Sequence, residues 1–246
     1  MTTIANTELG SVARTLSGVT TEAFELVDRI QAEAVADLDL DRPRRRADLS
    51  GTSDLVLAAL ARPGALVQGA GVVLEHRALA DAEWWLEWFA VDAEGRPQRL
   101  QISTDPGGVS SYEYEHLPWF AGPRATGQRH LTGPYVDYLC TEDYTLTFTA
   151  PVLVGSSFLG VAGADVGVSE LERRLLPALR AADTRLAVVN AHGRILASNR
   201  GRDTCGELID DLPSLKEHWG RDDRDPVTLV VIDDLPLAVV ALDRLG

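Results

Sequence analysis

Cysteine is scarce in this chain, and its scarcity limits how the fold can be held together. Cys140 and Cys205 are the two cysteines in 246 residues, and they are far apart in the sequence. No pair of Cys and His residues has the spacing of a zinc site, so we expect no bound metal and no cofactor. The first residues lack the basic stretch and apolar core of an export signal, and we therefore expect both thiols to be reduced.

Long apolar runs and an excess of basic charge are also missing. No window approaches 18 uninterrupted apolar residues, so no membrane span is predicted, and we expect a cytoplasmic protein. The chain has 23 Lys and Arg against 37 Asp and Glu, a formal net charge of −14. Binding to nucleic acid requires many basic groups, and an acidic surface is repelled by anionic lipid. The acidity serves solubility, or a part of it lies in a site that attracts cations.

Signatures of known catalytic sites are absent as well. The sequence contains no GxSxG elbow, no HExxH, no phosphate-binding P-loop and no GxGxxG after a strand. Asp and Glu are too numerous for the sequence to select a catalytic pair. We therefore expect a protein that is not an enzyme.

What the chain does contain begins with a long helix. Apolar residues spaced three and four apart between residues 3 and 38 predict a helix with one apolar stripe. The length is unusual for a globular protein, so we expect this helix to cross more than one lobe or to form the seam of a homodimer. The stripe consists of Leu9, Val12, Leu16, Val19, Ala23, Val27, Ile30, Ala34 and Leu38.

Beyond a short helix at 53–61, the apolar period changes towards two, which indicates strands. One strand has Trp84, Trp85 and Trp88, bulky groups on both faces, and we expect it to be covered on both sides. Another alternates Thr with Tyr, Leu, Phe and Ala, which is typical of a half-buried strand. The strands of this first lobe are expected at 66–75, 83–92, 97–103, 144–151 and 157–168, and a helix follows at 168–182.

A second, smaller set of strands follows that helix, at 185–190, 195–198, 228–233 and 237–242. The connections are too short for crossover helices, so the strands are expected to be antiparallel. The sequence thus predicts an α+β fold: a long N-terminal helix with linker (1–50), a larger lobe (51–183) and a smaller lobe (184–246). A lobe of about 60 residues is marginal alone, so we expect it to lean on the long helix or the larger lobe.

The stretch from residue 112 to 168 combines aromatic rings with carboxylates. Glycines within its last strand indicate a bulge or a close approach of the backbone. Such a collection is better suited to a small-ligand cage than to catalysis. Its motifs are Tyr112, Leu117-Pro118-Trp119-Phe120, Pro134-Tyr135-Val136-Asp137, Pro151-Val152 and Gly160-Val161-Ala162-Gly163-Ala164-Asp165.

These motifs and the order of elements resemble the double Cache sensor domain, the PAS-like ligand-binding module of bacterial receptors. The resemblance covers most of the chain, and the motifs of the larger lobe are its specific part. It implies a long helix that spans a distal and a proximal PAS-like lobe, and a small ligand in the distal lobe. The residues of these motifs that we expect to bind the ligand are Tyr112, Trp119, Phe120, Tyr135, Asp137 and Asp165, and His116 is added because it lies next to them in the sequence.

One departure from the resemblance concerns the ligand. Amino-acid-binding members use an Arg in the first run to grip the ligand carboxylate, and Leu117 stands in its place here. Leucine cannot form that bidentate pair. Asp165 can still pair with an ammonium group, and Trp119 offers the best ring face for a cation. We therefore expect a small, cationic amine as the ligand, not an α-amino acid.

Every candidate residue also has a purely structural explanation. Trp119 and Phe120 can be core aromatics, Asp165 can cap the helix that follows it, and Asp137 can bond to a turn. His116 can be an ordinary surface histidine.

Three functions remain open. The first is a stand-alone cytosolic sensor that signals to a regulator or kinase partner, as a homodimer. The second is a dimerisation module whose pocket is filled. The third is an enzyme on the same scaffold, because fold alone does not fix function.

Overall fold

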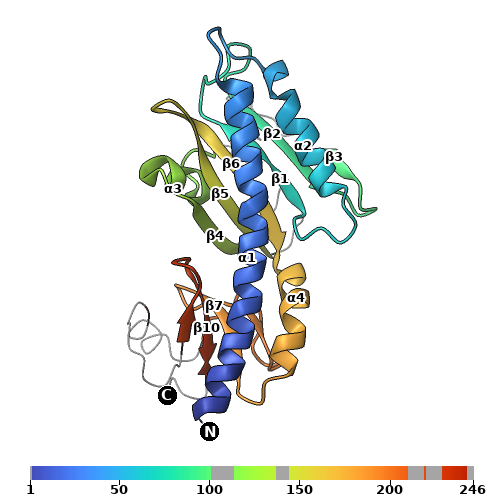
Figure 1. Cartoon of the computed structure of the whole chain (residues 1–246), viewed down its shortest axis with the longest axis vertical. Helices are drawn as coiled ribbons and strands as arrows, with labels where there is room; N and C mark the ends of the chain where they lie inside the picture. The colour runs from blue at the N-terminus through green and yellow to red at the C-terminus, as the bar shows by residue number, and fades with distance from the viewer. Residues whose placement is uncertain (1, 101–113, 137–143, 210–218, 220–228, 243–246) are drawn as a thin grey trace.

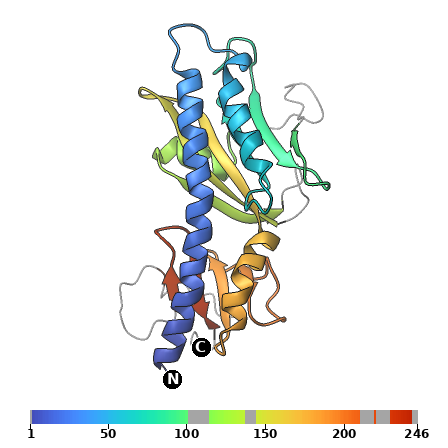
Figure 2. The same cartoon turned by 45° about the vertical axis from the view of Figure 1, so that its right-hand side comes forward.

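The computed structural model describes residues 2–100, 114–136, 144–209, 219 and 229–242, with four α-helices and two sheets among them. Helix α1 (Thr2–Leu38) runs along both sheets, as Figures 1 and 2 show. All nine residues of its predicted apolar stripe are buried. The helix prediction is therefore confirmed, and the reason for its length is that it crosses both lobes.

The distal lobe contains a six-stranded sheet in the order β3-β2-β1-β6-β5-β4, in which every neighbouring pair is antiparallel. Helices α1 and α2 (Ser50–Leu60) cover one face, and α3 (Pro118–Thr126) lies on the other. The strands are β1 (Gly69–Leu74), β2 (Trp85–Val91), β3 (Pro97–Arg99), β4 (His130–Val136), β5 (Tyr144–Val154) and β6 (Ser157–Gly167).

The proximal lobe contains a four-stranded antiparallel sheet in the order β8-β7-β10-β9. Helix α4 (Val168–Arg180) leads from the distal sheet into it and packs beside α1. The strands are β7 (Leu186–Asn190), β8 (Ile195–Ser198), β9 (Leu229–Val231) and β10 (Leu237–Ala241).

One continuous hydrophobic cluster joins α1, α4 and the facing sides of both sheets. The small lobe therefore leans on the long helix, as its size predicted. The α+β class, the long N-terminal helix and the two antiparallel sheets are confirmed, whereas the limits of the three divisions stay predictions. Because the apolar stripe is used within the chain, a homodimer through α1 also stays a prediction and would use the opposite face of the helix.

Strand β4 was not predicted, because Gly133 and Pro134 interrupt its pattern. Its pairing with β5 shifts register between Thr132 and Tyr135. Proline donates no hydrogen bond and is tolerated at the edge of a sheet, which is where β4 lies. The predicted close approach at Gly160 is confirmed: φ is 150°, and a Cβ there would lie 2.2 Å from the Val73 carbonyl oxygen.

Strand β2 is covered on both sides, as its tryptophans predicted. On the α2 side, Glu87 is buried and accepts hydrogen bonds from Trp85 Nε1, Ser53 Oγ and Arg99. On the α3 side, Trp88 packs among aromatic residues.

In the described part of the chain, no helix is long and apolar enough to cross a membrane. Cys205 is a free thiol whose pKa is raised to about 11, first by burial and then by Glu172. Cys140 lies outside the described residues.

Candidate ligand-binding site

The face of the distal sheet that lies towards α3 places small and polar residues side by side. The antiparallel register sets Asp165 of β6 between Gly69 of β1 and Thr147 of β5. Two residues along, Gly163 lies between Gly71 and Thr149. Because alternate residues of a strand share a face, these positions form one surface with little side-chain volume.

The carboxylate of Asp165 is held on this face by hydrogen bonds. The residue is 7% exposed, and Thr147 Oγ1 donates to its Oδ1 at 2.6 Å. The hydroxyl of Tyr135 lies 2.6 Å from Thr147 Oγ1. A threonine hydroxyl has one proton, which goes to Asp165, so Tyr135 donates to Thr147. The chain from Tyr135 through Thr147 fixes the position of the carboxylate.

Asp165 does not cap the following helix. The N-cap position of α4 is Gly167, and no side-chain hydrogen bond caps it. The structural explanation weighed for Asp165 is therefore wrong.

The threonines of β5 lie on a buried face. Thr145, Thr147 and Thr149 are between 0% and 3% exposed, although their alternation with apolar residues predicted a half-buried strand. That prediction is wrong, because the face that the threonines occupy is the one beneath α3 and the loop before it. The alternation of Thr with apolar residues is the sequence signal for Thr147, but such alternation ordinarily places the polar residues on the solvent side of a strand.

Trp88 forms the wall of this face beside Asp165. A Cβ at Gly69 would lie 3.1 Å from Trp88 Nε1 and 3.3 Å from Asp165 Oδ2, so both groups lie over the same glycine. A Cβ at Gly163 would lie 3.1 Å from Trp88 Cη2. The indole therefore lies across the strand positions that have no side chain. The sequence predicted only that the strand of Trp88 is covered on both sides.

An aromatic layer separates α3 from the sheet. Phe120 is fully buried and meets Tyr114, Trp119 and Phe158 with ring centroids 5.4, 6.1 and 5.5 Å away. Trp119 is 9% exposed, and its ring is 6.3 Å from that of Tyr114. Phe120 thus fits the description of a core aromatic, and Trp119 lies at the border of the layer.

Tyr114 anchors the segment that leads into α3. Its side chain is fully buried, and its hydroxyl donates to the Leu74 carbonyl oxygen at 2.6 Å. Burial raises the pKa of Tyr114 far above its ordinary value, so the hydroxyl keeps its proton. No motif identified Tyr114, because the sequence pattern favoured Tyr112 nearby.

Local sequence explains the placement of α3. Pro118 occupies the first turn, where its missing N–H costs nothing. Gly127 ends the helix in the left-handed conformation with φ of 68°, and its N–H donates to the Pro123 carbonyl oxygen. Leu117 is the N-cap and packs against the aromatic layer.

The other predicted residues fall in different places. His116 is exposed in the turn before α3, away from the buried face. Tyr112 and Asp137 lie outside the described residues. The structure therefore brings together Asp165, Tyr135 and the aromatic layer that contains Trp119, and it leaves His116 outside. Their roles in binding stay predictions. Among the residues described, no group of three or more His, Cys, Asp or Glu residues is arranged to hold a metal ion.

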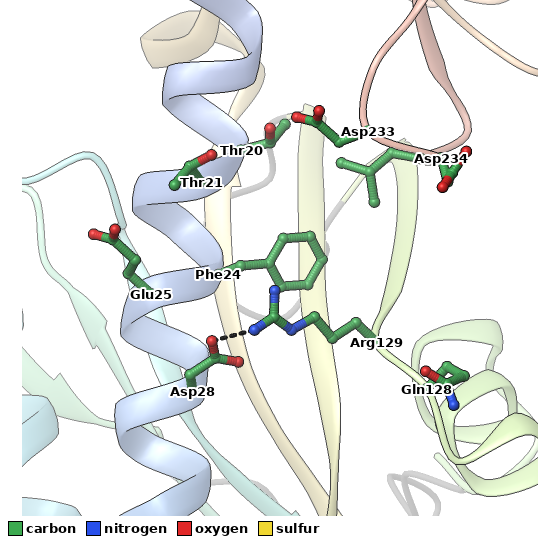
Figure 3. Close-up of a pocket in the computed structure, with 10 residues that line it drawn as sticks. Thr20, Thr21, Phe24, Glu25, Asp28, Gln128, Arg129, Asp233 and Asp234 are labelled. Carbon is green, nitrogen blue, oxygen red and sulfur yellow. Dashed lines mark hydrogen bonds and ion pairs between the residues drawn. The ribbon is translucent and has the colours of Figure 1, made fainter.

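Two cavities lie where the lobes meet. The larger, about 560 Å³, is bounded by α1, the turn between α3 and β4, and the β9–β10 hairpin, and its ten lining residues include Glu25, Asp28, Asp233 and Asp234. Figure 3 shows Arg129 reaching from that turn to α1, where it pairs with Asp28. The Arg129 Cζ atom lies 5.2 Å from the centroid of the Phe24 ring.

The smaller cavity, about 340 Å³, is named here the inter-lobe cavity. It lies between β4 and the first turn of α3 on one side and the β7–β8 turn on the other. Its lining residues are Pro118, His130, Leu131, Thr132, Gly133, Pro134, Tyr135, Asn190, Ala191, His192, Arg194 and Pro236.

Comparison with known proteins agrees with this architecture. Residues 87–173 match the sequence model of a family described as methyl-accepting chemotaxis protein-like, first PDC sensor domain. That range begins within β2, contains β3, α3, β4, β5 and β6, and ends within α4. No curated protein matches the chain significantly.

Solved structures resemble the whole chain. One is the extracellular domain of a protein assigned as a histidine kinase, soHK1S-Z6, with a TM-score of 0.66 and 15% identity over 96% of this chain and 90% of that one. Another is the ligand-binding domain of the Pseudomonas fluorescens chemoreceptor CtaA with L-valine: TM-score 0.59, 14% identity, 97% and 95% coverage. A third is that of the Pseudomonas aeruginosa PAO1 amino acid chemoreceptor PctC with GABA: TM-score 0.54, 18% identity, 93% and 93% coverage.

Proposed function

We propose that the chain is a double Cache (PDC-type) sensor domain, a ligand-binding module without catalytic activity, and that it senses a small cationic amine; the family match over residues 87–173 and the shared fold support this. The amine binds on the distal sheet face, beneath α3 and the segment before it. Its ammonium group pairs with Asp165. The aromatic rings of Trp88 and Trp119 contribute apolar and cation–π contacts.

The observation that carries the proposal is the Asp165 carboxylate, buried and fixed by the Tyr135–Thr147 hydrogen bonds. A carboxylate accepts several hydrogen bonds, and a buried carboxylate favours a cationic group as its ligand. The glycines beside Asp165 let the Trp88 indole lie close to the carboxylate, so that a ring face and a negative charge are next to each other.

A second observation separates this chain from its amino-acid-binding relatives. Two of the similar structures named above contain L-valine and GABA, both of which have a carboxylate. In this chain, Leu117 occupies the position where the family arginine would hold that carboxylate. A leucine side chain offers such a group no hydrogen-bond donor at this position, which disfavours amino acids.

The signal is proposed to leave the site through α1. The turn after α3 contacts α1 through the Arg129–Asp28 ion pair and the stacking of Arg129 on Phe24. Further along the helix, Ser17 Oγ donates to Asp233 of the proximal hairpin at 2.6 Å. A ligand that orders α3 favours one arrangement of these contacts over another, which is a population shift. The receiver is proposed to be a regulator or kinase, and the cytoplasmic location stays a prediction.

The proposal is tested by a thermal-shift screen of amines, quaternary ammonium compounds, amino acids, organic acids and purines. A ligand of the native state raises the melting temperature by mass action. We expect cationic amines alone to act at the distal site, and Asp165→Asn to weaken their binding by roughly 2 kcal/mol or more, about 30-fold. Asp183→Asn is the matched control, because Asp183 is exposed and far from the site.

Two results would count against the proposal. Wild-type affinity in the Asp165→Asn variant would show that the carboxylate is not the partner. No hit in the screen would favour an interaction module with a filled pocket. Leu117→Arg gives a complementary test: it should shift the preference towards ligands with a carboxylate.

A further inference from the structure

The inter-lobe cavity differs in charge from the rest of the molecule. The twelve residues that line it in the described part of the chain include His130, His192 and Arg194 and no Asp or Glu. This is unusual in a chain with 37 acidic and 23 basic residues. Three other cavities in the described part of the chain all have carboxylates in their lining. An anion therefore meets less repulsion here than in those cavities.

Asn190 fixes the proximal wall of this cavity. It is 4% exposed, and its Oδ1 accepts hydrogen bonds from the backbone N–H groups of His192 and Arg194, each at 3.0 Å. Its Nδ2 donates to the Gly133 carbonyl oxygen of β4 at 3.0 Å. One buried amide thus shapes the β7–β8 turn, places two basic side chains at the cavity, and ties the turn to the distal lobe.

The Arg194 guanidinium has more hydrogen-bond donors than its one bond within the chain uses. Its Nη1 donates to the Gly206 carbonyl oxygen at 2.7 Å. A guanidinium has five N–H donors in a planar fork, so this one bond fixes the side chain and leaves others to bind a ligand. That planar fork matches a carboxylate in a bidentate pair.

The distal wall adds neutral polar groups. The ring of His130 packs against Gly122, where a Cβ would lie 2.8 Å from Nδ1. Burial lowers the pKa of His130, so the imidazole is neutral near pH 7. The Tyr135 side chain extends from this wall towards Thr147 and Asp165. A volume of about 340 Å³ is at the small end of ligand pockets.

We propose that the inter-lobe cavity binds a small carboxylate, held by Arg194 and His192, as a second site distinct from the amine site on the distal face. Its walls come from both lobes, so an occupant contacts β4 and the β7–β8 turn at once. Binding there stabilises the arrangement in which the lobes are close. The Arg194 guanidinium can bind a carboxylate, which the Leu117 side chain on the distal face cannot.

The test uses isothermal titration of the whole chain with acetate, succinate and inorganic phosphate at pH 7. We expect succinate or acetate to bind, and Arg194→Gln to raise the dissociation constant at least 10-fold. Arg180→Gln removes the same charge from the exposed end of α4 and is the matched control, with a change below twofold. His192→Glu places a carboxylate at the exposed rim and should abolish binding without disturbing the core.

The Asp165→Asn variant separates the two sites. Carboxylate binding that persists in Asp165→Asn and is lost in Arg194→Gln supports the second site, whatever the outcome for amines. The reverse pattern places the carboxylate on the distal face and overturns the inference. It is equally overturned if no carboxylate binds the wild type, or if phosphate binds and the planar carboxylates do not.

Discussion

The distal and proximal sheets are built alike on one face and differently on the other. In both lobes the face towards α1 is largely apolar and belongs to the same hydrophobic cluster. The far face of the distal sheet contains Asp165, three threonines and glycines beneath an aromatic layer. The far face of the proximal sheet is aliphatic, with Ala187, Val189, Ile195, Ala238 and Val240 buried on it.

The difference shows which lobe is equipped to recognise a polar ligand. Polar residues on a buried face present hydrogen-bonding groups, whereas a face of Ala, Val and Ile packs by shape alone. The proximal lobe contributes polar groups instead at its edge, in the β7–β8 turn next to β4. Four changes would break or sharpen this comparison.

The largest effect is expected for the aromatic layer of the distal lobe. Phe120→Ala removes a fully buried ring that touches three other aromatic residues. Such truncations cost about 3–5 kcal/mol, because the surroundings close the cavity only in part. Urea unfolding measures the loss, and Phe158→Ala, at a half-buried position, should cost less. Equal costs would show that Phe120 is no more central to the layer than Phe158.

The next effect concerns the hydrogen bonds that hold Asp165. Thr147→Val keeps the shape and removes the donor to the carboxylate. Hydrogen bonds to charged groups contribute about 1.5–3 kcal/mol, and we expect amine binding, measured by calorimetry, to weaken by an amount in that range. Thr149→Val is the control, since its hydroxyl makes one long bond of 3.5 Å to His130. A similar loss in both variants would contradict a specific role for Thr147.

The reciprocal change tests the proximal face. Val189→Thr inserts a hydroxyl among aliphatic side chains. Burying a hydroxyl without a partner costs about 1–3 kcal/mol by protein mutational measures. We expect that loss in the free energy of unfolding, with amine affinity unchanged. A change in amine affinity equal to that of Thr147→Val would mean that the proximal sheet also contacts the ligand.

The smallest effect is a dependence of stability on pH through His130. Burial lowers its pKa in the folded chain, so the unfolded chain takes up the proton first as the pH falls through about 6.5. The free energy of unfolding therefore decreases as the pH is lowered through that window, and it levels off below the folded-state pKa. Replacing His130 by Gln should flatten the profile measured by thermal unfolding between pH 7 and 5. His116→Gln, at an exposed position, is the control.

Most of the fold was predictable because it rests on periodicity. The stripe of α1, the strands of both sheets and the α4 face all follow from spacings of two or of three and four. Strand β4 was not predictable in this way, because Gly133 and Pro134 break its pattern and only its pairing with β5 identifies it. The close approach at Gly160 could be predicted, since glycine is the residue that tolerates it.

The candidate site was predictable to a smaller degree. Motifs identified Asp165 and Tyr135, but the hydroxyl that joins them, Thr147, looked like the solvent side of a strand. Tyr114 and Trp88 are identified only by their contacts in the structure. Tyr114 donates to a carbonyl oxygen of β1, and Trp88 lies over Gly69 and Gly163.

The sequence by itself determined the α+β class, the long helix with its buried stripe and the acidic character of the surface, because these depend on composition and local spacing. The tertiary structure decided which face of each sheet is polar. It also decided that Asp165 accepts from Thr147 and does not cap α4, and that Arg194 of one lobe faces β4 of the other. These relations join residues far apart in the sequence, and strand register and packing set them.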